Sequence, residues 1–411
     1  MLRLLIPSSK NAKSIRMGMK SLKWYNTISI FSLIFLNSIY YSDIGGTESY
    51  YRKILLINGF LFLILNLKFL RNFFFIFAIS IFLVIFSLIF NFKTIGVAAI
   101  NSTFFTILGF LLLAMKPLIV SESQMKKLVI LSLLISLGLS SVAVVNAFFT
   151  LELFTGFSNF NINQNQAGIF FYTCITVTIL FIRKNWRILL IIPFYLMGLA
   201  TGSRAAFICS TLLILFSELL IIKNGEIETL RKNIFSIFKI FFVLGLFFVG
   251  IIYYLQDYIG YVFKRLTNVG LSTESTDMAD GRDMIWKSTF LMINDSPLAW
   301  IFGFGPASID SMLDRSTHNS FVDAIATKGV PFLLFALLGT IMLIYYHYRK
   351  RHLIVVFSIL NILIYGYTTS DLFGGIGTLW GLIIFISLWA RSISKNELTL
   401  SSDNYTSLKI L

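Results

Sequence analysis

The chain has 411 residues, of which 57% are hydrophobic and only 13% are charged, and its mean hydropathy is +0.82. A soluble fold cannot bury that much apolar surface, so these values exclude an ordinary soluble domain and favour a protein whose solvent is lipid. The net charge of +15 does not call for nucleic acid as a partner, because Lys and Arg concentrate in the cytoplasmic loops of membrane proteins.

The N-terminal region is basic ("RLLIPSSKNAKSIRMGMKSLK", residues 3–23) and runs directly into an apolar segment. It has no small-residue cleavage site, so a membrane segment is expected here rather than a signal peptide. The two cysteines, Cys174 and Cys209, both lie in apolar runs. Neither a disulfide framework nor a metal cluster is therefore expected, and no cofactor is predicted.

Apolar runs long enough to cross about 30 Å of hydrocarbon predict an all-α polytopic membrane protein with about twelve spans. The predicted spans lie near residues 24–41, 54–67, 72–90, 94–115, 127–149, 166–182, 186–201, 204–222, 237–256, 319–346, 353–367 and 374–390. They divide the chain into a helical region (1–256), one large extracytoplasmic loop (257–317), and a second helical region (318–411).

Charge gives the orientation of these spans. With the N-terminus inside, the cytoplasmic segments hold 24 of the 34 Lys and Arg residues, and the alternation holds at every crossing. We therefore predict a multi-pass membrane protein with both termini cytoplasmic. His347 and His352 then fall in a basic cytoplasmic cluster, where we interpret them as surface residues.

Arg204, in "LATGSRAAF", is the only charged residue between Ile188 and Ser217. The leg from Ile188 to Ala200 is 13 residues, about 20 Å of helix, so the "TGS" turn should lie below the outer surface. An Arg at that depth normally faces a partner or a wet cavity. Its planar guanidinium suits phosphate oxygens, although a snorkelling Arg remains an alternative.

Arg282, in "DGRDMIW", begins a predicted short amphipathic helix of the outer loop and is a candidate functional residue, with a solvated Arg or an Arg paired with Asp283 as the alternative. Four nearby acidic residues match no metal-ligand spacing, and we interpret them as a solvated face. They are Glu274, Asp277, Asp280 and Asp283.

His318 stands just before a predicted helix start in "STHNSFVD", where Ser320 and Asp323 have capping-box spacing. The positive end of the helix dipole favours a neutral imidazole that can accept a proton, and it also favours a bound anion. A polar interface residue is the alternative. A further stretch holds five Asn or Gln residues between positions 161 and 166, which suit sugar hydroxyls or form a plain polar loop.

Together, "NQNQAG", "TGSRAA", "GRDMIW" followed by "GFGP", and "THNSFVDAIATKGVP" resemble the bacterial O-antigen polymerase and O-antigen ligase family of membrane glycosyltransferases. Each motif is short, but the four occur in this order and on one predicted side. The matched region is residues 154–335. The resemblance implies a GT-C-like fold in the bacterial inner membrane, with the active site on the outer face. It also implies a donor in which the glycan is linked to undecaprenyl diphosphate.

The resemblance also implies roles for individual residues. His318 would activate the acceptor hydroxyl, and Arg204 and Arg282 would bind the diphosphate without a metal. Asn165, Asn319 and Arg315 become candidate substrate-binding residues, while Lys264 and Arg265 are further basic candidates in the loop.

Our preferred hypothesis is a polymerase that extends a lipid-linked polysaccharide, either O-antigen or capsule. A chain-length regulator and a flippase are its expected partners. A ligase that transfers the glycan to lipid A-core is the near alternative. A lipid-linked oligosaccharide flippase would explain the span count, but the chain shows no internal repeat.

Overall fold

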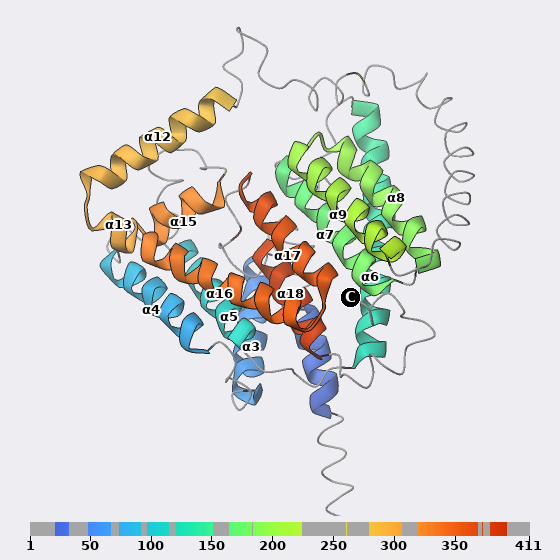
Figure 1. The fold of residues 1–411 in the computed structure, drawn as a ribbon, viewed down its shortest axis with the longest axis horizontal. Helices are drawn as coiled ribbons and strands as arrows, with labels where there is room; N and C mark the ends of the chain where they lie inside the picture. Colours follow the sequence, from blue (N-terminus) through green and yellow to red (C-terminus); the bar gives the residue numbers. More distant parts are fainter. Residues whose placement is uncertain are drawn as a thin grey trace, which may run out of the picture.

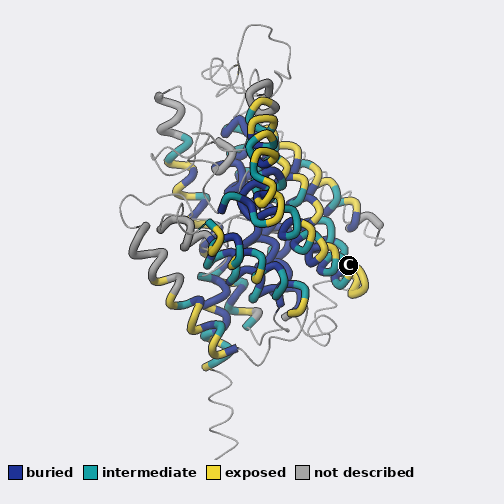
Figure 2. Tube along the Cα trace, turned by 90° about the vertical axis from the view of Figure 1, so that its left-hand side faces the viewer, coloured by how far each residue is buried: buried dark blue, intermediate teal, exposed yellow. Residues whose placement is uncertain are grey.

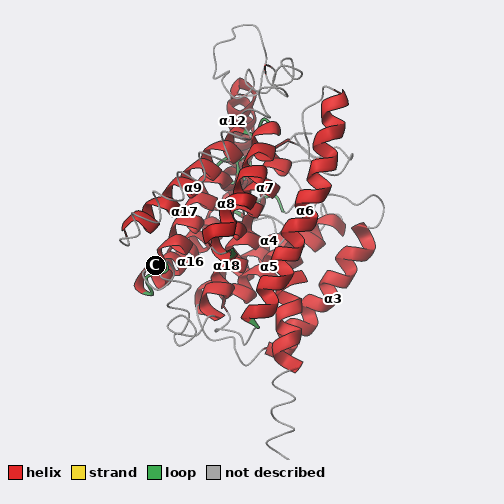
Figure 3. Cartoon of the chain, turned by 90° about the vertical axis from the view of Figure 1, so that its right-hand side faces the viewer, coloured by secondary structure: helices red, strands yellow, loops and turns green. Residues whose placement is uncertain are grey.

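The computed structural model describes residues 21–32, 48–66, 74–91, 97–114, 121–150, 164–182, 184–223, 279–305, 319–368 and 379–392, together with residues 260 and 372. Over these residues the regular structure is helical, which confirms the predicted all-α class (Figure 3). The predicted span at 237–256 lies outside the described residues. So does the part of the first predicted span that follows residue 32.

The helices follow the apolar runs closely. The first group is α3 (Glu48–Asn66), α4 (Phe74–Phe90), α5 (Val97–Ala114), α6 (Glu122–Thr150), α7 (Gln164–Phe181), α8 (Lys184–Ala200) and α9 (Arg204–Lys223). The second group is α12 (Ala279–Asp295), α13 (Ala299–Phe302), α15 (Ser320–Lys328), α16 (Val330–Arg349), α17 (Leu353–Gly366) and α18 (Leu379–Ser392). Figure 1 shows α7, α8 and α9 on one side of α17 and α18, and α4, α13 and α15 on the other.

Figure 2 shows exposed positions along the outer faces of the helices and buried positions towards the centre of the bundle. Many of the exposed residues are large hydrophobic ones. On α3, for example, Ile54, Ile57 and Ile64 are each more than half exposed, and α6 exposes Leu131 and Val142 in the same way. Two helical stretches in the described part of the chain are long and apolar enough to cross a membrane, Ser123–Val144 and Val330–Arg349. Several shorter apolar helices accompany them, and these include α4, α17 and nearly all of α18.

The centre of the bundle is aromatic. The Phe110 ring on α5 lies 5.4 Å from Phe77 of α4, 5.8 Å from Phe332 of α16 and 5.3 Å from Trp380 of α18, measured between ring centroids. All four side chains are fully buried. These rings join helices from both ends of the sequence into one core.

One end of the bundle collects the turns that carry basic residues, and we call it the basic end. Phe216, near the end of α9, stacks on Phe357 at the start of α17, with 3.7 Å between ring centroids. Arg391 of α18 donates from Nη1 to the carbonyl of Leu113 at the end of α5, at 2.9 Å. These helix ends adjoin the segments that charge predicts to be cytoplasmic.

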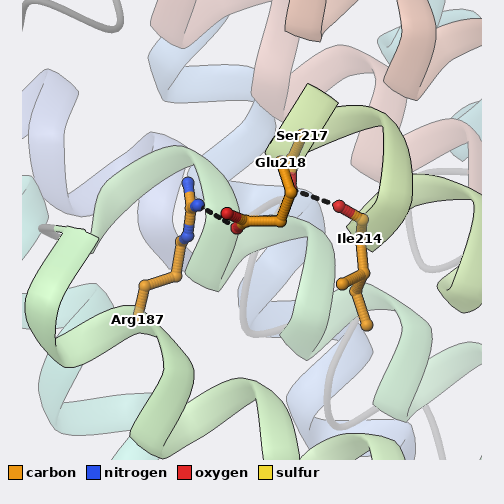
Figure 4. Close-up of polar contacts among 4 residues, drawn as sticks. All are labelled: Arg187, Ile214, Ser217 and Glu218. Atoms are coloured by element: carbon orange, nitrogen blue, oxygen red, sulfur yellow. Dashed lines mark hydrogen bonds and ion pairs between the residues drawn. The ribbon is translucent and has the colours of Figure 1, made fainter. Parts of the chain in front are cut away.

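An ion pair at the basic end ties α8 to α9. The guanidinium of Arg187 binds the carboxylate of Glu218, and Ser217 beside it donates to the carbonyl of Ile214 at 2.8 Å (Figure 4). Arg187 is buried, with 6% of its surface exposed. The two residues that flank the apolar hairpin in the sequence therefore meet in space, and the turn between α8 and α9 lies at the opposite end.

Three expectations from the sequence are wrong. The single helix expected at 319–346 is broken at Gly329 into α15 and α16, because Gly329 has φ +86° and Pro331 follows at the start of α16. His347 is completely buried rather than on the surface, and its Nδ1 lies 3.2 Å from Nδ1 of His352. Burial and the charge of Lys350 lower the pKa of His352 below 6.5.

The third wrong expectation concerns the large loop (257–317), which was expected to hold only a short helix. It contains α12, which has 17 residues, and α13. Figure 1 shows α12 (gold) running along one corner of the molecule, with α13 and α15 beneath it.

Candidate functional site at the end of helix 17

The "TGS" turn joins α8 to α9 as predicted. Thr201 donates from Oγ1 to the carbonyl of Gly198 at 2.7 Å and accepts from the backbone N–H of Ser203 at 3.2 Å. Gly202 has φ +66°, a conformation that suits glycine. Ser203 then accepts from the N–H of Ala206 at 3.4 Å, so it caps the N-terminus of α9.

Arg204 is the first residue of α9, as expected, and its side chain is exposed while the three residues before it are buried. Three orienting hydrogen bonds hold the turn, so the backbone under Arg204 is fixed. An exposed guanidinium on a fixed turn can reach a ligand without paying for reorganisation of the backbone.

The turn packs against α7 at the point where "NQNQAG" ends. A Cβ added to Gly168 would lie 2.7 Å from both Cβ and Oγ of Ser203. Any larger residue at position 168 would push α7 away from the turn. Glycine here brings the Asn- and Gln-rich start of α7 next to the Arg204 turn, so two of the four sequence motifs are neighbours.

The far end of α17 brings the other motifs to the same place. Tyr365 is fully buried and its side chain is hydrogen-bonded to Ser203 of the turn. Tyr367, two residues later, contacts Trp286 of α12, with ring centroids 5.9 Å apart and ring planes at 73°. We call this region the motif end of the bundle.

The start of α15 also lies at the motif end. The backbone N–H of Leu372 donates to Oγ of Ser320 at 2.8 Å, and a Cβ on Gly366 would lie 2.7 Å from Cδ2 of Leu372. Leu372 thus folds back over the last residue of α17 and connects it to the "THNSFVD" motif. His318 immediately precedes this connection in the chain.

Asn319 caps α15, where the sequence favoured Ser320. The Oδ1 of Asn319 accepts from the N–H groups of Phe321 at 2.9 Å and Val322 at 3.2 Å. Asn319 is 3% exposed and has extended backbone, φ −148° and ψ 111°, as an N-cap requires. Because Asn319 caps the helix, the Oγ of Ser320 can accept from the N–H of Leu372.

The other end of α15 interlocks with the "GFG" turn that follows α13. The N–H of Phe304 donates to the carbonyl of Ala326 at 2.7 Å, and that of Gly305 to the carbonyl of Thr327 at 3.0 Å. Gly303 and Gly329 both have positive φ, and a Cβ on either one would collide with backbone of the other segment. The sequence motifs "GFGP" and "ATKG" are therefore two halves of one backbone contact.

Helix α4 fixes this contact to the bundle. Ser87 donates to the carbonyl of Thr327 at 3.0 Å, and Asn91 donates to the carbonyl of Gly303 at 3.3 Å. The ring of Phe90 stacks on Phe302 with 4.2 Å between centroids. Held at α4 by one end and at α17 by the other, α15 positions the residue before it.

The candidate residues divide into three groups. Arg204 and Asn319 have described side chains and lie in elements that meet at α17. Arg282 and Asn165 lie in the first turns of α12 and α7, whose backbones are described while these two side chains are not. His318, Arg315, Lys264 and Arg265 lie outside the described residues, as do Glu274 and Asp277 of the acidic set.

Position 282 nevertheless has a defined place on its helix. It lies four residues before Trp286, so the two positions share one face of α12. Trp286 contacts the end of α17, and the Arg204 turn is hydrogen-bonded to that same end. The helix positions that carry the two arginines are both tied to the motif end.

Sequence reasoning missed the end of α17. The segment "YGYTTSDLFGG" (365–375) interrupts an apolar region with Tyr, Thr, Ser, Asp and Gly, and this polar interruption was the available signal. It also missed Lys328, which is 3% exposed and lies 5.0 Å above the ring of Phe332. Among the described residues, no three His, Cys, Asp or Glu side chains are grouped as a metal ligand set would be.

The helical bundle and its exposed apolar faces indicate a membrane protein, and the motif end is its candidate site. A family model described as O-antigen ligase matches residues 188–337. This confirms the resemblance to the O-antigen ligase and polymerase family, and it indicates a glycosyltransferase-type enzyme. The match contains Arg204, Arg282 and residue 318, whereas Asn165 precedes it. No curated protein matches the chain.

Proposed function

We propose that the chain is a polysaccharide polymerase of the bacterial inner membrane. Its donor is a glycan on undecaprenyl diphosphate, and its acceptor is a sugar hydroxyl of a lipid-linked repeat unit. The main support is the meeting of all four family motifs around the end of α17, through Ser203, Gly168, Trp286 and Ser320.

In the proposed reaction the acceptor oxygen attacks the anomeric carbon of the donor glycan. The bond from that carbon to the diphosphate oxygen breaks, and the electron pair leaves with undecaprenyl diphosphate. His318 accepts the proton of the hydroxyl as a general base. Arg204 and Arg282 stabilise the negative charge that grows on the leaving diphosphate, which is where fixed cations contribute most.

The geometry supports these roles in two ways. Residue 318 directly precedes the N-cap of α15, where the positive end of the helix favours a neutral imidazole and a nearby anion. Arg204 begins α9 on a hydrogen-bonded turn. Both groups are therefore next to rigid elements, which catalysis needs for orientation.

The ligase is the second candidate, and the printed description of the matching family model favours it. A ligase would use the same donor and the same chemistry, with lipid A-core as the acceptor. A flippase is the third. It would need access from both sides of the membrane, whereas the motifs gather at one end of the bundle.

The direct test is His318→Ala in a polymerase-deficient strain. We expect normal expression and membrane insertion but no polymer ladder, because the acceptor hydroxyl loses its base. His352→Gln is the matched control, since it alters a histidine at the opposite end of the bundle and should leave the ladder intact. A wild-type ladder from His318→Ala would remove His318 from the mechanism.

A further inference from the structure

The Trp286 and Tyr367 rings form an aromatic pair at the motif end that the proposed reaction does not use. They come from α12 and from the end of α17, and they meet edge to face. Tyr367 is 55% exposed and Trp286 is half-buried, so the pair is accessible at the surface. Edge-to-face contact between the rings holds both in a fixed arrangement.

The pair lies between the elements that carry the two arginines. Trp286 is one helical turn after position 282, and Tyr367 is two residues after Tyr365, which is bound to Ser203 of the Arg204 turn. Leu372 and Ser320 connect the same end of α17 to the start of α15. A group attached to a diphosphate held by the arginines would therefore emerge beside the rings.

Tyr and Trp rings combine a flat apolar body with one polar group, a hydroxyl or an indole N–H. A sugar has the matching surface, because its ring carries a C–H face and a rim of hydroxyls. Aliphatic lipid has no polar rim, and free phosphate has no apolar face. We infer that Trp286 and Tyr367 form a glycan-binding subsite that holds the sugar next to the diphosphate; this inference rests on the proposed function.

Interface anchoring is the competing explanation, since Trp and Tyr often lie where membrane meets water. Trp300 of α13 offers a matched control, because it is 36% exposed and lies in the same outer segment. Its indole N–H donates to Asn294 at 3.2 Å and its ring stacks on Phe290, so it does not face α17. Anchoring predicts the same effect from all three aromatic residues, whereas a subsite involves only two.

The experiment measures binding of two probes to the purified full chain in lipid nanodiscs. One probe is a disaccharide linked to undecaprenyl diphosphate, and the other is undecaprenyl diphosphate without sugar. We expect Trp286→Ala and Tyr367→Ala each to weaken binding of the first probe about tenfold, the effect of losing roughly one aromatic contact. Binding of the sugar-free probe should not change. Trp300→Ala should bind both probes as the wild type does, and Trp286→Phe and Tyr367→Phe should keep most of the affinity.

Two results would overturn the subsite while leaving the proposed function intact. One is unchanged binding of the disaccharide probe in both Ala variants, and the other is equal weakening of both probes. Failure of the wild type to bind the disaccharide probe at all would contradict the proposed function itself. Thermal unfolding of each variant separates loss of the ring from loss of the fold, and Trp286→Leu serves as an apolar replacement that has no ring.

Discussion

Arg204 stands on a turn whose backbone is hydrogen-bonded on both sides, and its side chain is exposed. A guanidinium presents its N–H donors as a rigid planar fork that matches two phosphate oxygens, whereas the three donors of an ammonium group are not arranged in such a fork. Arg and Lys carry the same charge, so replacing Arg204 by Lys tests the fork geometry alone.

We expect Arg204→Lys to reduce transfer at least about a hundredfold, equivalent to losing roughly 3 kcal/mol of charge stabilisation. The measurement is the initial rate with a lipid-linked donor in detergent. Lys287→Arg is a suitable control, because Lys287 is an exposed cation on α12 and the change should have no effect. Full activity of Arg204→Lys would argue against a bidentate contact to the diphosphate.

Asn319 holds the start of α15 through its side-chain cap. Asn319→Ala removes the acceptor for two N–H groups of α15, so we expect a loss of about 1 kcal/mol of stability. We expect the transfer rate to fall by more than the loss of folded protein accounts for, since residue 318 loses its fixed neighbour. Asn319→Asp keeps the cap and should restore stability in thermal unfolding. Equal stability of the Ala and Asp variants would show that the cap contributes nothing.

At the scale of elements, the interlock between the "GFG" turn and α15 depends on two glycines. Gly329 has φ +86° and ψ 164°, a region that residues with a Cβ rarely enter, and its missing side chain makes room for Ile301. The contact determines where α15 ends and where α16 begins.

We expect Gly329→Ala to cost about 1–3 kcal/mol through backbone strain, with a further cost from the collision. Gly138→Ala in α6 is the matched control, because a Cβ there meets nothing within 4 Å. That change should stabilise the helix by up to about 1 kcal/mol. Thermal unfolding of both variants measures the difference, and a neutral Gly329→Ala would contradict the interlock.

The Arg187–Glu218 pair holds the α8–α9 hairpin closed at the basic end. Removing one partner leaves a buried charge, so Glu218→Leu alone should destabilise the chain by about 3 kcal/mol. The double variant Arg187→Met with Glu218→Leu should recover most of that loss, because both charges are gone. A double variant as unstable as the single one would mean that the pair does more than neutralise Arg187.

The elements of this fold were largely predictable from the sequence, and their junctions were not. Runs of apolar residues are enough to place α4, α7 and α9, because a helix in lipid needs only length and hydrophobicity. The break at Gly329 lies inside the segment 319–346 that was predicted as a single span, although "KGVP" carries both of its causes. Asn319 and Ser320 are adjacent and both are good caps, so only the structure decides between them.

The site was predictable in its members but not in its centre. "TGSRAA" and "THNSFVD" were recognised because each places a charged or titratable residue at a helix start. The centre of the motif end consists of contacts between residues far apart in sequence, such as Tyr365 with Ser203 and Trp286 with Tyr367. No local pattern encodes such pairs.

At the scale of the whole molecule, the bundle has two ends with different chemistry. The basic end holds Arg187, Arg391 and the turn between α16 and α17. The motif end holds the Arg204 turn, α12 and the start of α15. In the proposed reaction, both lipid-linked substrates would bind at the motif end.

We propose that the motif end catalyses growth of a glycan on a lipid carrier. The most direct measurement uses the purified chain with one lipid-linked repeat unit as both donor and acceptor, and with lipid A-core in a parallel reaction. We predict a ladder of products that grows by whole repeat units, its loss in His318→Ala, and no product on lipid A-core. Transfer to lipid A-core without a ladder would contradict the claim.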